Sequence, residues 1–245
     1  MKKALLVMSG LLALSVALPA PGDAQIGIRG GINLTDFFGD RVDNTDPVQS
    51  MSYGLTAGLI RIGPVQIVAE GYYRKKGAGW RVLDAIGAGG GLGGLDSAQV
   101  AGLAGAGSGG ESLEFGLDYV EVPLLLRFNL PTYGRRFRPY FNAGPAFGWQ
   151  IDCGVTVSVA AGAGSEPEAA CEDLSGENVK ETLREYETGL VVGAGLDVSV
   201  LGGAGALTLD LRMTRGLSRL SEGQNGPDVR NQAISAMLGY TFGFF

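Results

Sequence analysis

The sequence predicts an all-β fold: an eight-stranded, antiparallel, up-and-down transmembrane β-barrel behind an N-terminal signal peptide. Three observations predict it. The chain ends on a strand-like stretch with aromatic residues on one face, eight segments alternate between apolar and small or polar residues, and short connections take turns with long ones. Because successive side chains of a strand point to opposite faces, this alternation gives each strand one apolar face.

The N-terminus has the layout of an export signal. Lys2 and Lys3 precede an apolar run from Ala4 to Leu18, and small residues follow as far as Ala24. A transmembrane helix is the alternative, but the run is shorter than the roughly 20 residues that such a helix needs. We therefore expect residues 1–24 to be a signal peptide and residues 25–245 to form an outer-membrane β-barrel domain.

The expected strands show alternation of period two. In the fourth, Val120, Val122 and Leu124 share one face, while Glu121 and Pro123 lie on the other. The eight expected strands span Ile26–Leu34, Ser52–Arg61, Val65–Arg74, Leu113–Leu130, Arg138–Ile151, Glu185–Val200, Ala206–Leu217 and Arg230–Phe244.

The connections between these strands alternate strictly in length, starting with a long one. In an antiparallel meander every second connection lies at the same end, so all the long loops emerge together. Outer-membrane barrels have short periplasmic turns and longer extracellular loops, so we expect both termini to be periplasmic. The long connections are Thr35–Met51, Lys75–Ser112, Asp152–Arg184 and Ser218–Val229.

The last expected strand carries aromatic residues near its end. Ile234, Leu238, Tyr240, Phe242 and Phe244 fall on one parity, and small or polar residues fall mainly on the other. In a transmembrane barrel the last strand pairs with the first and places aromatic residues at the lipid interface. This ending favours a barrel whose apolar face points toward lipid.

A soluble lipocalin-like barrel also alternates, with its apolar face inward around a ligand. The composition of the less apolar face decides between the two. It consists mainly of Gly, Ala, Ser and Thr, with a few charges of both signs, which suits the crowded interior of an eight-stranded barrel. We expect this lumen to be closed by side chains. The charged residues expected to form a lumen charge network are Arg29, Glu70, Glu121, Arg127, Asp197, Asp210 and Arg212.

Four stretches carry a resemblance to a known family. They are Ala24–Asn33, Leu117–Leu125, Arg138–Pro145 and Gly239–Phe244. With them, the chain resembles the porin-like or PorT-like outer-membrane β-barrels, small proteins similar in architecture to OmpX and the OmpA barrel. The resemblance covers nearly all of the mature chain. It implies a fold and an outer-membrane location, but no single activity.

The closing stretch also resembles the signal that the barrel-assembly machinery recognises, which implies this machinery as a partner during insertion. Gly239, Phe242 and Phe244 fit that signal as a glycine followed by two spaced hydrophobic residues. Met237 stands where a polar residue is usual, and Phe245 is an additional residue at the end.

Several kinds of chemistry are not expected. The chain has no histidine, the usual general base near neutral pH. Buried carboxylates such as Glu121 and Asp210 are expected to pair with lumen arginines rather than catalyse a reaction. The glycine-rich run Ile86–Gly94 lacks the Lys-Ser/Thr ending of a phosphate-binding loop, and the aspartates of the first long loop do not match a calcium-binding pattern. We expect no enzyme, cofactor or metal.

The two cysteines, Cys153 and Cys171, both fall in the third long connection. An even number of cysteines in an exported protein favours a disulfide. We therefore predict a Cys153–Cys171 bond that braces this connection.

The function predicted from the sequence is that of a structural or surface-interaction barrel that acts through its extracellular loops, without catalysis. A narrow porin-like channel or a transport-associated barrel is the alternative. The expected partners are outer-membrane lipid, the assembly machinery and an extracellular ligand bound by the loops. Nucleic acid is not expected, because the formal net charge is −6 and no long basic run occurs.

Overall fold

The structure is a computed structural model that describes residues 25–39, 46–81, 112–132, 136–158, 169–170, 184–200, 204–219 and 228–242. Within these ranges the secondary structure consists of strands. They are β1 (Gln25–Gly39), β2 (Asp46–Ile62), β3 (Val65–Arg81), β4 (Ser112–Asn129), β5 (Phe137–Ser158), β6 (Ala169–Ala170), β7 (Tyr186–Val200), β8 (Gly205–Gly216) and β9 (Val229–Phe242).

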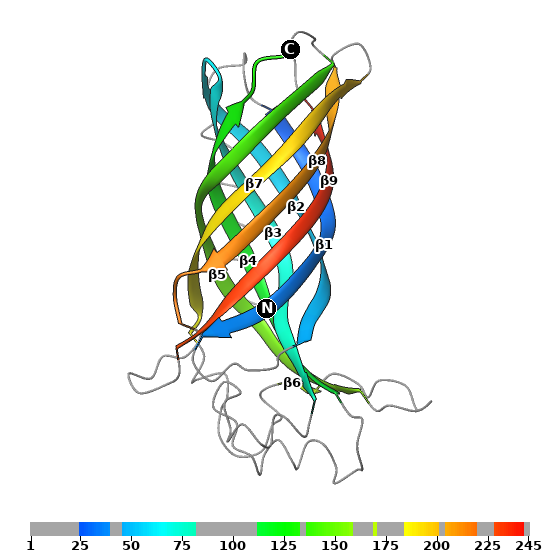
Figure 1. Cartoon of the computed structure of the whole chain (residues 1–245), viewed down its shortest axis with the longest axis vertical. Coiled ribbons are helices and arrows are strands. Elements are labelled where there is room, and N and C mark those ends of the chain that lie inside the picture. The colour runs from blue at the N-terminus through cyan, green and yellow to red at the C-terminus, as the bar shows by residue number, and fades with distance from the viewer. Residues whose placement is uncertain are drawn as a thin grey trace.

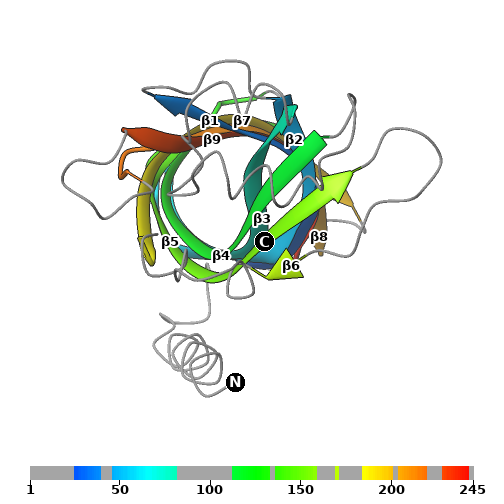
Figure 2. The ribbon, with the colours of Figure 1, turned by 90° about the horizontal axis from the view of Figure 1, so that it is seen from below.

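Eight long strands close into an up-and-down antiparallel barrel. Each long strand pairs with the next long strand along the chain, so β5 pairs with β7 and the short β6 lies outside the ring. The last strand, β9, closes the ring by pairing with β1. Figure 1 shows the tilted strands in profile, and Figure 2 shows the ring from one end. The closing register runs from Ile26 opposite Phe242 to Gly39 opposite Val229. Closure leaves no unpaired edge in the ring, as a hydrocarbon environment requires. The predicted fold class is confirmed.

The eight expected segments correspond to the eight long strands, but several expected ends were wrong. On the side of the long connections the strands run further: β1 reaches Gly39, β3 reaches Arg81, β5 reaches Ser158, and β2 begins at Asp46. Polar and charged residues there suggested loops. They remain in strands because their side chains alternate between the barrel interior and the outer wall, and Lys76 is buried inside.

The two-residue strand β6 was not predicted. Ala169 and Ala170 pair with Val155 and Gly154 of β5, beyond the ring of the barrel (Figure 1). A strand this short has no alternation of its own, so the sequence contained no signal for it.

The outer wall of the barrel is apolar. Its large hydrophobic residues are exposed, which is the arrangement expected of a surface that contacts lipid. Among the residues described, no helix has both the length and the hydropathy to cross a membrane. The most exposed apolar side chains, all at or above 55 % exposure, are Met51, Tyr53, Leu55, Ile62, Leu126, Phe141, Tyr186, Leu211, Ile234 and Leu238.

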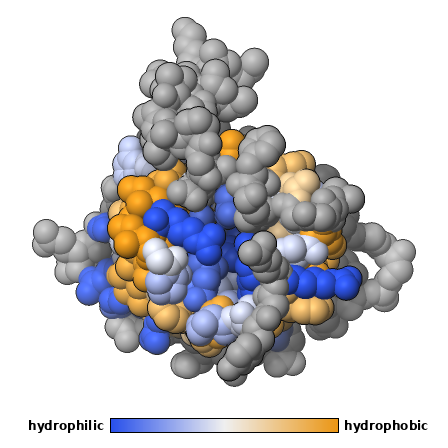
Figure 3. Space-filling model, turned by 90° about the horizontal axis from the view of Figure 1, so that it is seen from above, coloured by the Kyte–Doolittle hydropathy of each residue, from blue (hydrophilic) through white to orange (hydrophobic). Residues whose placement is uncertain are grey.

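The interior of the barrel is mainly polar. Seen from the end that carries the Ile62–Val65 turn, hydrophilic side chains gather at the centre and hydrophobic ones surround them (Figure 3). A purely apolar cluster exists inside, but it is small and consists of Leu125, Ala146 and Val191. The barrel is therefore inverted relative to a water-soluble barrel, with charge inside and hydrocarbon outside. We call the end with the Ile62–Val65 turn the short-turn end and the opposite end the long-loop end.

Candidate functional site in the barrel lumen

Ten charged side chains are buried inside the described part of the barrel, five cationic and five anionic. Each is at most 7 % exposed, so the interior holds equal numbers of opposite charges away from bulk water. Buried charges are tolerated only when they are paired, which makes this set the defining feature of the lumen. The ten residues are Arg29, Glu70, Arg74, Lys76, Glu121, Arg127, Glu187, Asp197, Asp210 and Arg212.

The central layer consists of two arginines that share two carboxylates. Arg212 on β8 binds both oxygens of Glu70 on β3, one of them at 3.0 Å, and also binds Asp210. Arg29 on β1 lies 3.0 Å from Glu70 and 3.4 Å from Asp210. The layer thus joins strands from different sides of the ring.

Neutral side chains complete the hydrogen bonding of this layer. The Tyr140 hydroxyl and the Asn142 amide, both on β5, donate to Oδ2 of Asp210, the amide at 3.1 Å. Thr56 on β2 donates to Glu70 at 3.4 Å. Oδ2 of Asp210 and Oε1 of Glu70 each accept from more than one donor, so side chains of the interior take the place of water around these two anions.

Glycines make room for the central layer. Arg29 has Gly54 of β2 and Gly239 of β9 as its register partners on the two sides. A Cβ atom at Gly239 would lie 2.7 Å from Cγ of Arg29, and one at Gly195 would lie 2.3 Å from the Tyr140 ring. The local sequence therefore combines long polar side chains with glycines on the facing strands.

A second layer lies nearer the long-loop end. Nζ of Lys76 lies 2.8 Å from Glu121 and 3.2 Å from Glu187, and Arg74 lies 3.1 Å from Glu121. The Asn231 amide donates to Glu187 at 2.9 Å. This long-loop layer joins β3, β4, β7 and β9.

A third layer occupies the short-turn end. Arg127 on β4 pairs with Asp197 on β7, and its Nε donates to Asn129 at 3.1 Å. The Arg127 guanidinium stacks over the Tyr140 ring, 3.5 Å from the ring centre. Thr208 donates to Asp197 at 2.8 Å. We call this set the short-turn layer.

The structure places all seven residues named for the lumen network inside the barrel: Arg29, Glu70, Glu121, Arg127, Asp197, Asp210 and Arg212. It also brings in Arg74, Lys76 and Glu187, which the sequence analysis had missed. Arg74, the last residue of the expected third strand, and Lys76 continue the parity of Glu70, so following that parity to the end of the expected strand and two residues beyond it would have found both.

The residues of the expected assembly signal are described only in part. Gly239 lies on the lumen side of β9, opposite Arg29, and Phe242 is 53 % exposed on the outer wall. Phe244 falls outside the described residues. No set of three or more His, Cys, Asp or Glu side chains within the described ranges is placed to hold a metal ion.

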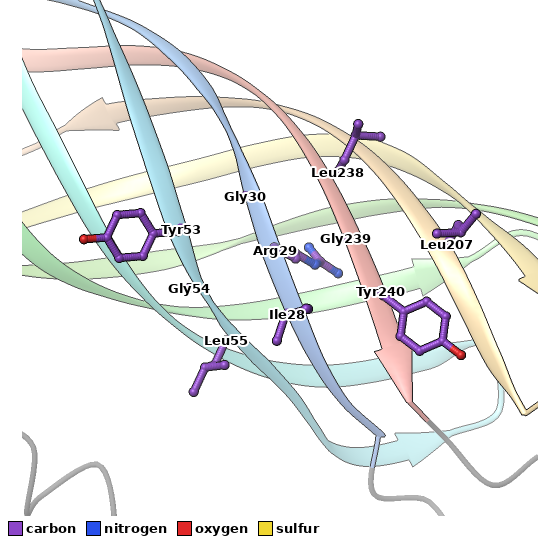
Figure 4. A pocket seen from close by; sticks show the side chains of 10 residues that line it. All are labelled: Ile28, Arg29, Gly30, Tyr53, Gly54, Leu55, Leu207, Leu238, Gly239 and Tyr240. Atoms are coloured by element: carbon purple, nitrogen blue, oxygen red, sulfur yellow. The ribbon is translucent and has the colours of Figure 1, made fainter.

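The outer wall carries a shallow apolar hollow across β1, β2, β8 and β9 (Figure 4). It lies where Gly30 leaves a gap between Tyr53 and Leu238, its register partners. Side chains around it point outward, whereas Arg29 points into the barrel (Figure 4). The side chains that border the hollow are otherwise apolar, so it belongs to the surface that faces lipid.

The geometry agrees with the comparison to known sequences. The family model for the outer membrane protein beta-barrel domain matches residues 17–222. The chain belongs to this family. It is therefore an outer membrane β-barrel protein, and the location implied by the resemblance is supported. The sequence matches none of the curated proteins.

Solved structures of other outer membrane proteins are similar to this barrel at low sequence identity. The Neisserial surface protein A is 11 % identical with a TM-score of 0.44, over 89 % of this chain and 97 % of its own. Pseudomonas aeruginosa OprG is 13 % identical with a TM-score of 0.45, over 93 % and 99 %. The outer membrane enzyme PagL is 10 % identical with a TM-score of 0.37, over 89 % and 99 %. Such similarity concerns the fold alone, since one fold hosts different functions.

The central layer leads to a prediction about stability. Replacing Glu70 with Gln leaves Arg29 and Arg212 with one carboxylate between them inside the barrel. We expect the E70Q barrel to lose about 3–5 kcal/mol of unfolding free energy, because a stranded buried charge is costly. Urea unfolding of the refolded protein in lipid vesicles measures this loss.

Glu185→Gln is the matched control, because Glu185 is exposed at the long-loop end. This variant should stay within about 0.5 kcal/mol of the native barrel. Equal stability of the two variants would show that the ion pairs of the central layer contribute little.

The cysteines lead to a second prediction. Cys153 lies buried in β5 and is not a free thiol, while Cys171 falls outside the described residues. Gly154 pairs with Ala170 and Val155 with Ala169, so the next step of this antiparallel register would match position 153 with position 171. The Cys153–Cys171 bond stays a prediction, and this register supports it.

Mass spectrometry of the intact protein, alkylated without reduction, should show no added mass. After reduction both cysteines should react. Uptake of the reagent by both cysteines before reduction would overturn the bond.

Proposed function

We propose that this protein is a closed, non-catalytic barrel that holds its long connections outside the cell and its termini in the periplasm. The lumen charge network is the observation that carries the proposal. Three layers of paired charges fill the bore from the short-turn end toward the long-loop end. An eight-stranded ring encloses little more than its own side chains, so a filled bore favours a role on the surface over transport.

The direction of the barrel in the membrane is part of the same proposal. The strands extend furthest at the long-loop end, where β3, β4 and β5 continue beyond the rest of the ring (Figure 1). Long connections on a rigid scaffold are the usual location of binding sites, and outer-membrane barrels direct them outward. The proposed partners are accordingly an extracellular ligand at the long connections and lipid around the apolar wall.

The lack of catalysis is also a proposal. The chain has no histidine, and its buried carboxylates are engaged with arginine or lysine. A carboxylate held by cations and hydrogen-bond donors is stabilised in its charged form and is a poor proton acceptor. The barrel-assembly machinery remains the proposed partner for insertion through Gly239, Phe242 and Phe244.

The orientation can be tested by labelling intact cells. Ser97→Cys lies in the second long connection and Thr132→Cys lies in a short one. A membrane-impermeant maleimide should label S97C in intact cells and T132C only after the outer membrane is permeabilised. The native protein, which carries only Cys153 and Cys171, is treated in the same way and gives the background level of labelling. Labelling of T132C in intact cells, without labelling of S97C, would reverse the proposed orientation.

The closed bore can be tested in planar lipid bilayers. The purified native barrel should show no large, steady conductance, because paired charges of both signs obstruct the ion path. Heat-dependent migration on a denaturing gel controls for correct folding of the inserted protein. A steady, reproducible conductance from folded monomer would favour the alternative, a narrow porin-like channel.

A further inference from the structure

The hollow on the outer wall follows from the register of the strands around the β1–β9 seam. In the row of register partners nearer the short-turn end, four large side chains follow one another on β2, β1, β9 and β8: Leu55, Ile28, Tyr240 and Leu207. In the next row, Gly30 stands between Tyr53 of β2 and Leu238 of β9. The second row is therefore interrupted at Gly30, and the space left there is the hollow, of about 640 Å³ (Figure 4).

The packing of the barrel does not require a glycine at position 30. A Cβ atom there would meet the backbone oxygen of Ser52 at 3.6 Å, which is an ordinary contact, and Gly30 lies in a regular strand without a positive φ. At the neighbouring Gly31, on the lumen side, a Cβ atom would lie 2.1 Å from the Ala236 oxygen. A glycine inside a strand costs stability and often marks a close approach by a ligand or another backbone. Gly30 thus leaves room for something outside the barrel.

The walls of the hollow are held in place by neighbouring side chains. The Tyr53 ring stacks on Tyr73, with 5.2 Å between ring centres, and the Tyr240 ring meets Phe242 edge-on at 4.6 Å. Tyr53 is 61 % exposed and Leu238 is 68 % exposed, so both stand out from the wall on either side of Gly30. A hollow with fixed walls loses little conformational entropy when it is filled.

We propose that this hollow binds one acyl chain of an outer-membrane lipid in a fixed position. The hollow is continuous with the apolar wall that contacts lipid, and Arg29, the charged residue among those that line it, points into the barrel (Figure 4). A methylene chain is narrow enough to lie over Gly30 between Tyr53 and Leu238. Because the surrounding lipid is also apolar, close packing rather than the hydrophobic effect supplies the preference for the hollow. The proposal holds for either orientation of the barrel in the membrane.

The experiment uses the full-length barrel in phosphatidylcholine nanodiscs that contain a small share of phosphatidylcholine with a photoreactive group in one acyl chain. After illumination, mass spectrometry of peptides locates the lipid adducts on the barrel wall. Adducts on Ile28–Gly30 and Leu238–Tyr240 should exceed those on the wall of β4, β5 and β7 by about threefold or more, because a packed chain stays longer than a chain in contact with an even wall.

Gly30→Leu is the variant that fills the hollow. It should lower the adducts at the hollow to the level of the remaining wall, and it should fold, because the new side chain has room toward the lipid. Leu238→Ala removes an exposed wall of the hollow and should lower the adducts on Ile28–Gly30 as well.

Ala143→Leu is the matched control. It adds the same side chain to an exposed alanine of β5, on the opposite side of the ring, and should leave the adducts at the hollow unchanged. Heat-dependent gel migration checks that all three variants fold.

An even spread of adducts over the wall of the native barrel, or equal adducts at the hollow in the native barrel and G30L, would overturn the proposal. Chemical cross-linking of the native barrel in phosphatidylcholine vesicles tests for a second copy as the occupant. A cross-linked dimer that G30L abolishes and A143L retains would also overturn the proposal and assign the hollow to an interface between two copies of this chain.

Discussion

The barrel depends on the sharing of Glu70 between Arg29 and Arg212. These residues come from β3, β1 and β8, and all three side chains are almost completely buried. Away from water the attraction between opposite charges is strong, but a buried charge that loses its partner strongly destabilises the folded barrel. The pairs therefore do two things at once: they fix opposite walls of the ring relative to each other and they occupy the bore. The layers toward each end repeat the same arrangement with other residues.

This filling accounts for glycines on the lumen side of the strands. The chain contains 42 glycines in 245 residues, and many lie on the lumen side of the strands. A narrow ring cannot hold arginine and tyrosine side chains unless the facing positions are nearly empty. Gly195 beside Tyr140 and Gly239 beside Arg29 show this directly, since a Cβ atom at either position would collide with the polar side chain. Glycine here provides volume for charge rather than flexibility of the backbone.

The sequence was sufficient to predict the fold and most residues of the lumen charge network, but not which of these residues pair with each other. Alternation and the rhythm of the connections predicted the eight long strands, and parity predicted the seven charged residues that face the lumen. The pairing of Arg212 with Glu70, 142 residues away, could not be predicted, because it depends on the stagger of the closed ring. Lys76 was missed because it falls in the expected connection Lys75–Ser112, and Arg74, the last residue of the expected strand, was missed because its partner Glu121 is found only in the structure.

A double-mutant cycle between Glu70 and Arg212 tests the central claim most directly. Unfolding free energies are measured for the native barrel, Glu70→Gln, Arg212→Met and the double variant. If the buried pair holds the ring, the double variant should be more stable than the sum of the single effects predicts, by about 1–3 kcal/mol, because it no longer contains a stranded charge. Additive effects, within about 0.5 kcal/mol, would contradict the account and show that the two residues stabilise the barrel independently.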